Sequence, residues 1–391
     1  MRRRCGATSP SDPRRDPPDD PVTLDAAAPA RTTGTVRVVG TGLLGTSAAL
    51  ALTLRGVDVV LVDPSPTAVA LARDLGAGRF PAAGDDPRLV LVAAPPDVVA
   101  DVVAAELIAF PDAVVTDVAS VKGGPLAALT ARGADLSRYV GSHPMAGRER
   151  SGAVSARTDL FAGRPWVVAA HDLAAPAAVR AVHDLATDCG GVPVTMGAAE
   201  HDAAVAVVSH APQVAASLVA ARLREASEPA VALAGQGLRD VTRIAGSDPT
   251  LWAQILAGNA APVADVLEDL RRDLDDVVAA LRALARDPAA PGARGRLARV
   301  IADGGAGRDR IPGKHGSAPT AYATVVVVVP DRPGALAGLL TDVDAAGVNL
   351  EDLRLEHSEG QAVALAAVDV LPAAAGPLAE ALRGRGWTVP L

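Results

Sequence analysis

Residues 141–152 hold the densest group of chemically capable side chains in this sequence. They read Gly-Ser-His-Pro-Met-Ala-Gly-Arg-Glu-Arg-Ser-Gly and interrupt a composition dominated by alanine, valine and leucine. The imidazole of His143 can accept a proton from a hydroxyl group while a hydride leaves the same carbon, because its ordinary pKa is near ~6.5. Alone, such a histidine is more often a satisfied core or surface residue, so a second signal is needed.

A glycine-rich turn, long before His143 in the sequence, supplies that signal. It follows the apolar run 36–39, precedes a helical pattern, and has the dinucleotide-type sequence Gly40-Thr41-Gly42-Leu43-Leu44-Gly45. Glycines at these positions permit a tight turn and let backbone N–H groups approach a pyrophosphate at the helix N-terminus. The alternative is a glycine-rich turn in an α/β domain that binds no nucleotide.

Asp63 supports the nucleotide interpretation. It ends the strand expected at 57–62 and lies 18 residues after Gly45, close to the ~20 residues typical of a carboxylate that binds the ribose. Its negative charge would repel a 2′-phosphate, which favours NAD over NADP. Together with His143, the turn and this carboxylate predict a hydride-transfer enzyme that uses NAD.

Three further positions could complete such a site. Ser120 follows a strand expected at 113–116 and could hydrogen-bond the nicotinamide or the reacting hydroxyl, while Lys122 is either structural or attracts an anion. Arg243 suits an anionic substrate, because guanidinium groups form bidentate bonds to carboxylates. The alternative for Arg243 is a surface ion pair with Asp240 or Asp248.

The sequence predicts no metal site. His201 and His210 lie nine residues apart on one expected helix, a spacing that is poor for joint ligation of an ion. The two cysteines in the chain are too few for a disulfide framework or a cysteine-based metal site.

Composition narrows the class of protein. A net charge of -8 disfavours nucleic acid as the main partner. The basic N-terminus lacks an apolar signal-peptide core, which with the low cysteine content predicts a cytoplasmic location. The uncharged run 203–221 is nominally of membrane length, but its polar residues favour a largely buried helix of a soluble protein over a membrane span.

The pattern of apolar runs predicts several parts in this chain of 391 residues. Continuous valine and leucine runs that alternate with helical patterns predict a Rossmann-type, doubly wound parallel sheet. Long helical segments at about 198–226, 228–245, 249–258 and 260–285 then predict an all-α domain. The last part has the order β-α-β-β-α-β of a ferredoxin-like domain, with a last edge strand at 387–389. The expected parts are a disordered tail (1–34), a dinucleotide-binding domain (35–197), a helical substrate and dimerisation domain (198–302), a linker (303–320) and a C-terminal domain (321–391).

Over residues 35–391 the chain resembles a prephenate dehydrogenase of tyrosine biosynthesis followed by an ACT amino-acid-sensing domain. The resemblance implies oxidative decarboxylation of prephenate to 4-hydroxyphenylpyruvate with NAD. All-helical domains of this kind often dimerise, so we expect a homodimer. It rests on the glycine turn and on the segments Asp117-Val118-Ala119-Ser120-Val121-Lys122, 141–152, Glu200-His201-Asp202, Ser209-His210-Ala211-Pro212 and Thr242-Arg243-Ile244-Ala245.

The resemblance also implies roles for individual residues. His143 would accept the proton of the C4 hydroxyl with Ser120 as its partner, and Arg243 would anchor a carboxylate. The pocket would be shaped by His210, Glu149 and Trp252. In the ACT-like tail, the expected effector residues for tyrosine feedback are Asp331, Gly334 and Asn349.

Three alternatives stay open at this point. Arogenate, which carries an ammonium group where prephenate has a keto group, could be the substrate. Another NAD-linked dehydrogenase acting on a hydroxy acid would have a similar build, although it should not need the Thr-Arg-Ile-Ala segment. A non-catalytic amino-acid sensor could retain the nucleotide fold. One departure from the family pattern is Gln213, where a second histidine often follows Ser-His-x-Pro.

Overall fold

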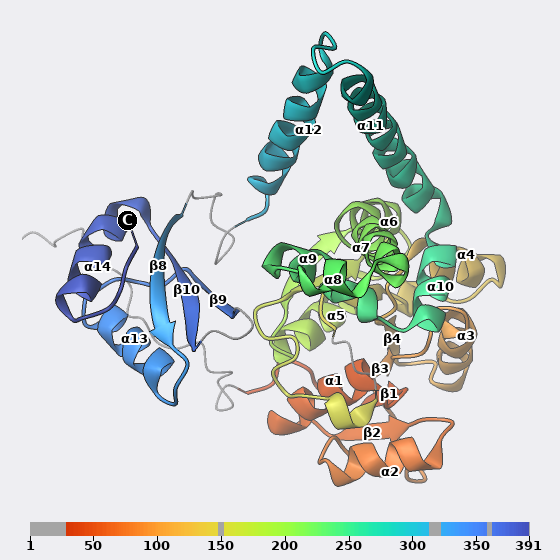
Figure 1. The fold of residues 1–391 in the computed structure, drawn as a ribbon. Helices are drawn as coiled ribbons and strands as arrows, with labels where there is room; N and C mark the ends of the chain where they lie inside the picture. Colours follow the sequence, from red (N-terminus) through yellow and green to blue (C-terminus); the bar gives the residue numbers. More distant parts are fainter. Residues whose placement is uncertain (1–28, 148–151, 313–321, 358–361, 391) are drawn as a thin grey trace, which may run out of the picture. The chain divides into compact units, whose positions relative to one another are not determined.

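The computed structural model describes residues 29–147, 152–312, 322–357 and 362–390, so the predicted site residue Glu149 lies outside it. Helices make up most of the region predicted at 198–302 (Figure 1). This region is shared between two compact units. The first unit comprises Met1–Ala226 and Val241–Leu267, and the second comprises Ser227–Asp240 and Glu268–Leu391.

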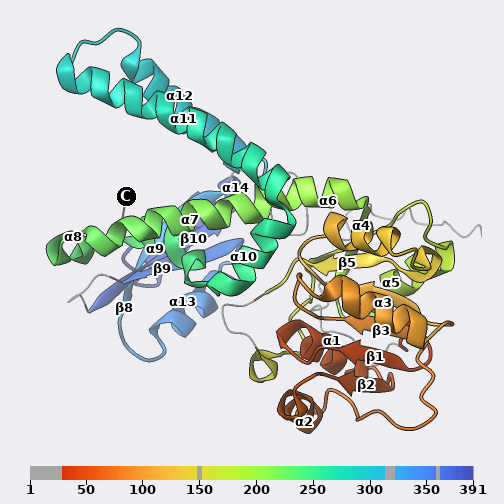
Figure 2. The same ribbon diagram turned by 90° about the vertical axis from the view of Figure 1, so that its right-hand side faces the viewer.

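The first unit begins with a four-stranded parallel sheet in the order β2-β1-β3-β4, which confirms the predicted Rossmann-like architecture. Successive side chains of a strand point to opposite faces, and the valines and leucines of these strands are buried on both faces. Helices α1 and α2 pack on one face, and α3 and α4 on the other (Figure 2). The bounds are β1 Val36–Val39, α1 Leu43–Leu54, β2 Val59–Val62, α2 Pro66–Asp74, β3 Leu89–Val92, α3 Val99–Ala109, β4 Val114–Asp117 and α4 Gly123–Ala131.

A second sheet in this unit differs from the prediction of one continuous parallel sheet. Its order is β5-β6-β7, and β5 runs antiparallel to β6 while β6 and β7 are parallel. Parallel neighbours need a long crossover, usually a helix, but only the short 3-10 turn Ala153–Ser155 is described between β5 and β6. His143 is the third of the four residues of β5 and therefore lies near the carboxyl end of this strand. The ladder partner β6 is antiparallel, whereas Tyr139, just before β5, forms a parallel bridge to Val115 of β4. The bounds are β5 Gly141–Pro144, β6 Pro165–Ala169, α5 Pro176–Asp188 and β7 Val192–Met196.

Part of the predicted disordered tail is bound to this unit. The backbone N–H groups of Arg31 and Thr32 donate hydrogen bonds of 3.1 and 2.7 Å to the buried carboxylate of Asp188 at the end of α5. The prediction of disorder over 1–34 is therefore wrong for these two residues, because two charge-assisted bonds hold them. Residues 1–28 lie outside the described part of the chain.

The helix expected at 198–226 contains one π-helical turn. Helix α6 (Ala198–Val205) passes through this turn (Ala206–His210) into α7 (Ala211–Arg222), where the N–H of Ala211 bonds to the carbonyl of Ala206. Pro212 has no N–H to continue the regular ladder, which explains a local change of hydrogen bonding.

This long helix is less buried than the sequence predicts. The segment Ala198–Glu225 is long and apolar enough to cross a membrane by length and composition alone, and the structure buries 33% of its apolar window. Val207, Val208, Leu218 and Val219 are exposed. The expectation of a largely buried helix is therefore wrong for a single copy of the chain, which leaves an apolar surface on it.

Two of the remaining helices differ in length from the prediction. The helix predicted at 228–245 is broken into short pieces, and the last helix before the C-terminal sheet continues past residue 302 into the predicted linker. The bounds are α8 Glu228–Ala232, α9 Gln236–Thr242, the 3-10 turn Arg243–Gly246, α10 Pro249–Gly258, α11 Ala260–Arg286 and α12 Ala293–Arg308.

The C-terminal part of the second unit has its own apolar core. Its antiparallel sheet has the order β8-β10-β9, and α13 and α14 pack into the same core. Where the sequence predicts a last edge strand at 387–389, the structure has an isolated antiparallel bridge between Thr388 and Val328. The bounds are β8 Ala323–Pro330, α13 Ala335–Asp344, β9 Asp352–His357, β10 Val363–Val370 and α14 Pro372–Gly384.

Candidate active site

The glycine turn between β1 and α1 is shaped by steric constraints at two of its three glycines. A Cβ on Gly40, whose φ is +101°, would lie 2.4 Å from the carbonyl oxygen of Ala93. A Cβ on Gly45 would lie 1.9 Å from the carbonyl oxygen of Gly40. A Cβ on Gly42 would meet nothing within 4 Å, so the turn leaves open space at the N-terminus of α1, where phosphates bind. These residues therefore fit a dinucleotide.

Asp63 holds the turn against the end of β2. Its Oδ2 accepts hydrogen bonds from the Thr41 N–H at 2.7 Å and the Thr41 hydroxyl at 3.1 Å, and its Oδ1 accepts one from the Ser65 N–H at 2.9 Å. An ionised carboxylate offers about four acceptor positions, which leaves capacity for a ribose hydroxyl.

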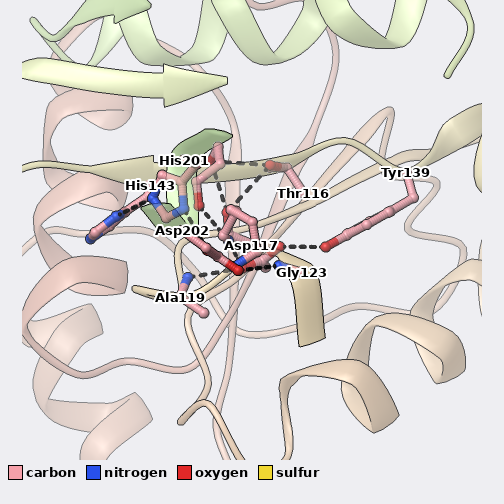
Figure 3. A network of polar contacts seen from close by, with 10 residues as sticks. Thr116, Asp117, Ala119, Gly123, Tyr139, His143, His201 and Asp202 are labelled. Carbon is pink, nitrogen blue, oxygen red and sulfur yellow. Dashed lines mark hydrogen bonds and ion pairs between the residues drawn. The ribbon is translucent and has the colours of Figure 1, made fainter. Parts of the chain in front are cut away.

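His143 lies in a chain of three hydrogen-bonded side chains (Figure 3). Its Nδ1 is 2.9 Å from Nε2 of His201, and Nδ1 of His201 is 2.8 Å from Oδ1 of Asp202. The two imidazole rings meet edge to face at 73°. His201 is 0% exposed and His143 is 8% exposed. The base predicted from sequence is therefore buried, and one of its two ring nitrogens is engaged by the protein.

Asp202 connects this chain to the N-terminus of α4. Its two carboxylate oxygens accept hydrogen bonds from the Lys122 N–H at 2.9 Å and the Gly123 N–H at 2.8 Å. Burial raises the pKa of Asp202, but the bonds from His201 and from these two N–H groups outweigh it and hold that pKa below the ordinary value. Asp202 is thus an ionised acceptor at neutral pH.

A second buried group lies beside β5. The Lys122 ammonium forms a short ion pair with Oδ1 of Asp117 and donates a 2.7 Å bond to the carbonyl of Ser142. The Tyr139 hydroxyl donates a 2.7 Å bond to Oδ2 of Asp117. Burial lowers the pKa of Lys122, although Asp117 opposes the shift. Of the two interpretations from sequence, these contacts support the structural one for Lys122.

The surroundings of His143 disfavour its charged form. Burial is the largest cause and sets the pKa of His143 well below its ordinary value, and the nearby His201, Lys122 and His210 lower it further. A neutral imidazole is the form that can accept a proton. The electrostatics of the site therefore agree with use of His143 as a base.

His210 is held by a separate contact at the end of the π-helical turn. Asn259 Nδ2 donates a 2.8 Å hydrogen bond to the backbone carbonyl of Asp202 and lies 3.0 Å from His210 Nδ1. The rings of His210 and Trp252 meet edge to face with centroids 6.0 Å apart. Burial lowers the pKa of His210 as well. The structure thus brings His210 and Trp252 together and links them to the helix that carries His201.

The other predicted site residues lie on a loop and on a short turn. Ser120 is half-buried in the loop between β4 and α4, and Arg243 is exposed at the start of a 3-10 turn. That turn is tied to α7, because Gln213 Nε2 donates a 3.0 Å bond to the carbonyl of Ile244. Gln213, the departure from the family pattern, therefore has a structural contact next to Arg243. Within the described ranges, no group of three metal-ligating side chains could hold an ion.

Sequence reasoning did not assign His201, Asp202, Asn259, Asp117 or Tyr139 to the site. Two signals could have found part of this set. Asn259 is one of only two asparagines, and the Glu200-His201-Asp202 motif carries the family resemblance without a role attached to it. Asp117 begins a segment that carries the resemblance, again without a role attached to it. Tyr139 gave no signal, because a buried polar partner is visible only once the strands are assembled.

A cavity of about 690 Å³ lies in the C-terminal part of the second unit. That volume is within the range of small-molecule sites, and Arg332, Gly334 and Trp387 line it. Gly334 has a φ of +84° at the start of α13. The other predicted effector residues, Asp331 and Asn349, are not in its lining, and Asn349 instead donates a 2.9 Å bond to Glu351.

Comparison with known proteins agrees with this geometry. Residues 48–195 match the family model described as the nucleotide-binding domain of prephenate dehydrogenase, and residues 197–292 match the model of its dimerization domain. The probable prephenate dehydrogenase NovF of Streptomyces niveus is 40% identical, over 90% of this chain and 98% of its own length. Prephenate dehydrogenase of Bacillus subtilis is 29% identical, over 82% of this chain and 88% of its own length.

Solved structures give the same result. The structure of prephenate dehydrogenase from Aquifex aeolicus in complex with hydroxyphenyl propionate and NAD+ has a TM-score of 0.62 and 26% identity, covering 71% of this chain and 98% of that chain. Synechocystis arogenate dehydrogenase has a TM-score of 0.57 and 25% identity, covering 71% and 99%. The chain therefore belongs to the prephenate dehydrogenase family of NAD-dependent dehydrogenases.

Proposed function

We propose that the first unit catalyses the oxidative decarboxylation of prephenate to 4-hydroxyphenylpyruvate, with His143 as the base. The observation that carries this proposal is the neutral, buried imidazole of His143, one nitrogen of which is held by His201. The alternatives of a hydroxy-acid dehydrogenase and of a sensor without activity lose support, since the family matches cover both the nucleotide-binding and the helical parts.

The glycine turn and Asp63 would hold NAD. The backbone of Gly40, Thr41, Gly42, Leu43, Leu44 and Gly45 surrounds the open space at the start of α1, and Asp63 would bind the ribose. When bound, the oxidised nicotinamide supplies an acceptor for the hydride that leaves C4 of prephenate.

His143 would take the proton of the C4 hydroxyl as that hydride leaves, with Ser120 as hydrogen-bond partner of the same oxygen. The C4 carbon becomes a ketone, and loss of carbon dioxide then places the bonding electrons in the ring, which becomes an aromatic phenolate. His143 would return its proton to the oxygen, a step favoured because its buried surroundings disfavour the imidazolium.

The remaining predicted residues would bind the dianionic substrate. Arg243 would anchor a carboxylate by a bidentate bond, and His210 and Trp252 would form one wall of the pocket. Glu149, which lies outside the described residues, keeps the role of a pocket residue on the resemblance alone.

The test of the proposed reaction is NADH formation with prephenate as substrate, compared with arogenate at equal concentration. We expect a kcat/KM for prephenate at least about tenfold higher, equivalent to ~1.4 kcal/mol. Faster turnover of arogenate would show that arogenate, and not prephenate, is the substrate. If the protein bound NAD+ and tyrosine but turned over neither compound, it would be a sensor. The similar fold of Synechocystis arogenate dehydrogenase means that fold alone does not make this choice.

We also propose that the protein is a homodimer and that it works in the cytoplasm. The exposed apolar side chains of the long helix support the homodimer. Val207, Val208, Leu218 and Val219 are exposed in one copy, and the matching family model is that of a dimerization domain. We expect light scattering to give the mass of a dimer, and Leu218→Glu to shift the protein toward monomer. A monomeric wild type would contradict this proposal.

We also propose that residues 321–391 form an ACT-like domain that binds tyrosine and lowers activity. Support comes from its β-α-β-β-α order, from its separate core, and from the cavity beside Gly334. The test titrates tyrosine against NADH formation by the full chain and by residues 1–320. Equal inhibition of both proteins would remove this role from the C-terminal part.

A further inference from the structure

We infer that His201 and Asp202 are positioning residues that hold His143 in a single tautomer, with the proton on Nδ1 and a free lone pair on Nε2. This inference rests on the proposed role of His143 as the base. It assigns to the Glu200-His201-Asp202 segment a task that the fold alone does not require. It also specifies which nitrogen of His143 meets the substrate hydroxyl.

The direction of each hydrogen bond follows from Asp202. An ionised carboxylate can only accept, and Asp202 already accepts the N–H groups of Lys122 and Gly123. Nδ1 of His201 must therefore donate to Oδ1 of Asp202 across 2.8 Å. With one ring proton, which we assign to Nδ1, His201 offers only a lone pair at Nε2, so Nδ1 of His143 donates to it across 2.9 Å. The proton-accepting position of His143 is consequently Nε2.

The two positioning residues are themselves fixed on several sides. Asp202 takes the place of a local side-chain cap for α4, whose own N-cap residue, Lys122, makes no side-chain cap bond. A Cβ on Gly123 would approach Oδ2 of Asp202 to 2.8 Å, so glycine allows this close contact. The backbone carbonyl of Asp202 accepts a bond from Asn259, and His201 is fully buried. These contacts leave little freedom for the hydrogen bonds from His143 to Asp202 to reverse their direction.

His210 provides an internal contrast. The carbonyl of Asp202 can only accept, so the atom of Asn259 that faces it must be the amide nitrogen, and that same nitrogen faces Nδ1 of His210. Nδ1 of a neutral His210 must then accept, which leaves its proton on Nε2. The network thus places two neighbouring histidines in opposite tautomers, one an acceptor and the other a donor at Nε2.

The direct test is nitrogen-15 NMR of the histidine rings in the labelled full chain, with signals assigned through His143→Gln and His210→Gln. We expect His143 to carry its proton on Nδ1 and His210 on Nε2. The reverse tautomer at His143, or fast averaging between the two forms, would overturn the inference. This result does not depend on turnover, so it stands or falls separately from the proposed reaction.

A kinetic test uses two substitutions of one residue. His201→Gln keeps an amide oxygen that can accept from His143 and an amide nitrogen that can donate to Asp202, whereas His201→Phe keeps a ring without either. We expect His201→Phe to lower kcat about 10- to 100-fold, less than the ~10²- to 10⁴-fold contribution of a general base, with KM for prephenate and NAD+ changed less than about threefold. His201→Gln should recover most of the rate.

The same substitutions in a His143→Ala background separate positioning from mere structural support. A residue that acts through His143 has nothing left to position, so His201→Phe should cause no further loss in kcat there. Losses that multiply in the double variant, or equal rates for His201→Phe and His201→Gln, would overturn the inference. A His143→Ala variant with the wild-type rate would instead contradict the proposed base and leave the NMR result as the judge of the tautomer.

Discussion

The glycine turn and the histidine network lie in the same unit, but the geometry of each is fixed in an opposite way. The turn depends on side chains that are missing, since a Cβ on Gly40 or Gly45 would collide with backbone oxygen atoms. The network depends on side chains that satisfy one another, from His143 through His201 to Asp202. A binding surface for phosphates can be made of backbone, whereas a proton acceptor needs a defined ring nitrogen and therefore a chain of partners.

This difference predicts different responses to substitution. A substitution on the closed side of the turn should destabilise the fold through steric conflict, and one on the open side should weaken only the binding of the cofactor. The network should fail through unsatisfied polar groups, and isosteric replacements that keep the hydrogen bonds should be tolerated.

The largest effect is expected for the buried ion pair next to the network. Lys122→Met leaves the Asp117 carboxylate buried without its cation, which costs about 3–5 kcal/mol of the free energy of unfolding. Urea unfolding followed by circular dichroism measures this loss. Adding Asp117→Asn should return part of it, because the uncompensated charge is removed. A Lys122→Met protein as stable as wild type would show that the pair contributes nothing.

The next effect concerns the closed side of the turn. Gly45→Ala forces a Cβ toward the Gly40 carbonyl at 1.9 Å, and overpacking of this kind costs about 1–3 kcal/mol. We expect both the free energy of unfolding and the affinity for NAD+ to fall. Unchanged stability in the same urea experiment would contradict the steric account of this glycine.

Gly42→Ala is the matched control on the open side of the turn. Its Cβ meets no protein atom within 4 Å, so the free energy of unfolding should stay within about 0.5 kcal/mol of wild type. The methyl group would occupy the space proposed for the pyrophosphate, and we expect the Kd for NAD+ to rise about tenfold by calorimetry, equivalent to ~1.4 kcal/mol. Wild-type affinity would mean that the cofactor lies elsewhere.

The smallest effect is the position of the acid limb of the pH profile. Burial, with His201, Lys122 and His210 nearby, lowers the pKa of His143, so the base stays unprotonated to lower pH than an exposed histidine would. We expect kcat to be maintained as pH falls through ~6.5 and to decline only below it. The unfolded chain binds this proton more readily than the folded chain, so the free energy of unfolding also decreases below that pH. An acid limb centred above ~6.5 would contradict the depressed pKa.

The two regions were also unequally predictable from sequence. The glycine turn, the strands beside it and Asp63 follow from local patterns, because their constraints act between residues close in the chain. The same holds for the C-terminal elements between 323 and 384. The long helix was predicted to be largely buried, yet most of its apolar window is not buried in one copy of the chain.

Within the chain from His143 to Asp202, only His143 was predicted as a site residue, and His210 was predicted beside it. Lys122 and Asn259 are rare residue types, since each is one of two residues of its type. Their partners are Asp117 and Ser142 for Lys122, and Asp202 and His210 for Asn259, and most of these contacts join residues that are far apart in the chain. Asp202 accepts N–H groups from positions 79 and 80 residues earlier in the chain. Local periodicity carries no information about such contacts, nor about the antiparallel direction of β5.

The central claim is that cofactor binding and proton acceptance are separate tasks of separate regions, and one measurement on His143→Ala tests it most directly. NADH formation from prephenate and the Kd for NAD+ are determined on the same protein preparation. The account predicts a kcat lowered by ~10²- to 10⁴-fold with a Kd for NAD+ within about twofold of wild type. A wild-type rate, or a loss of rate matched by an equal loss of NAD+ affinity, would contradict it.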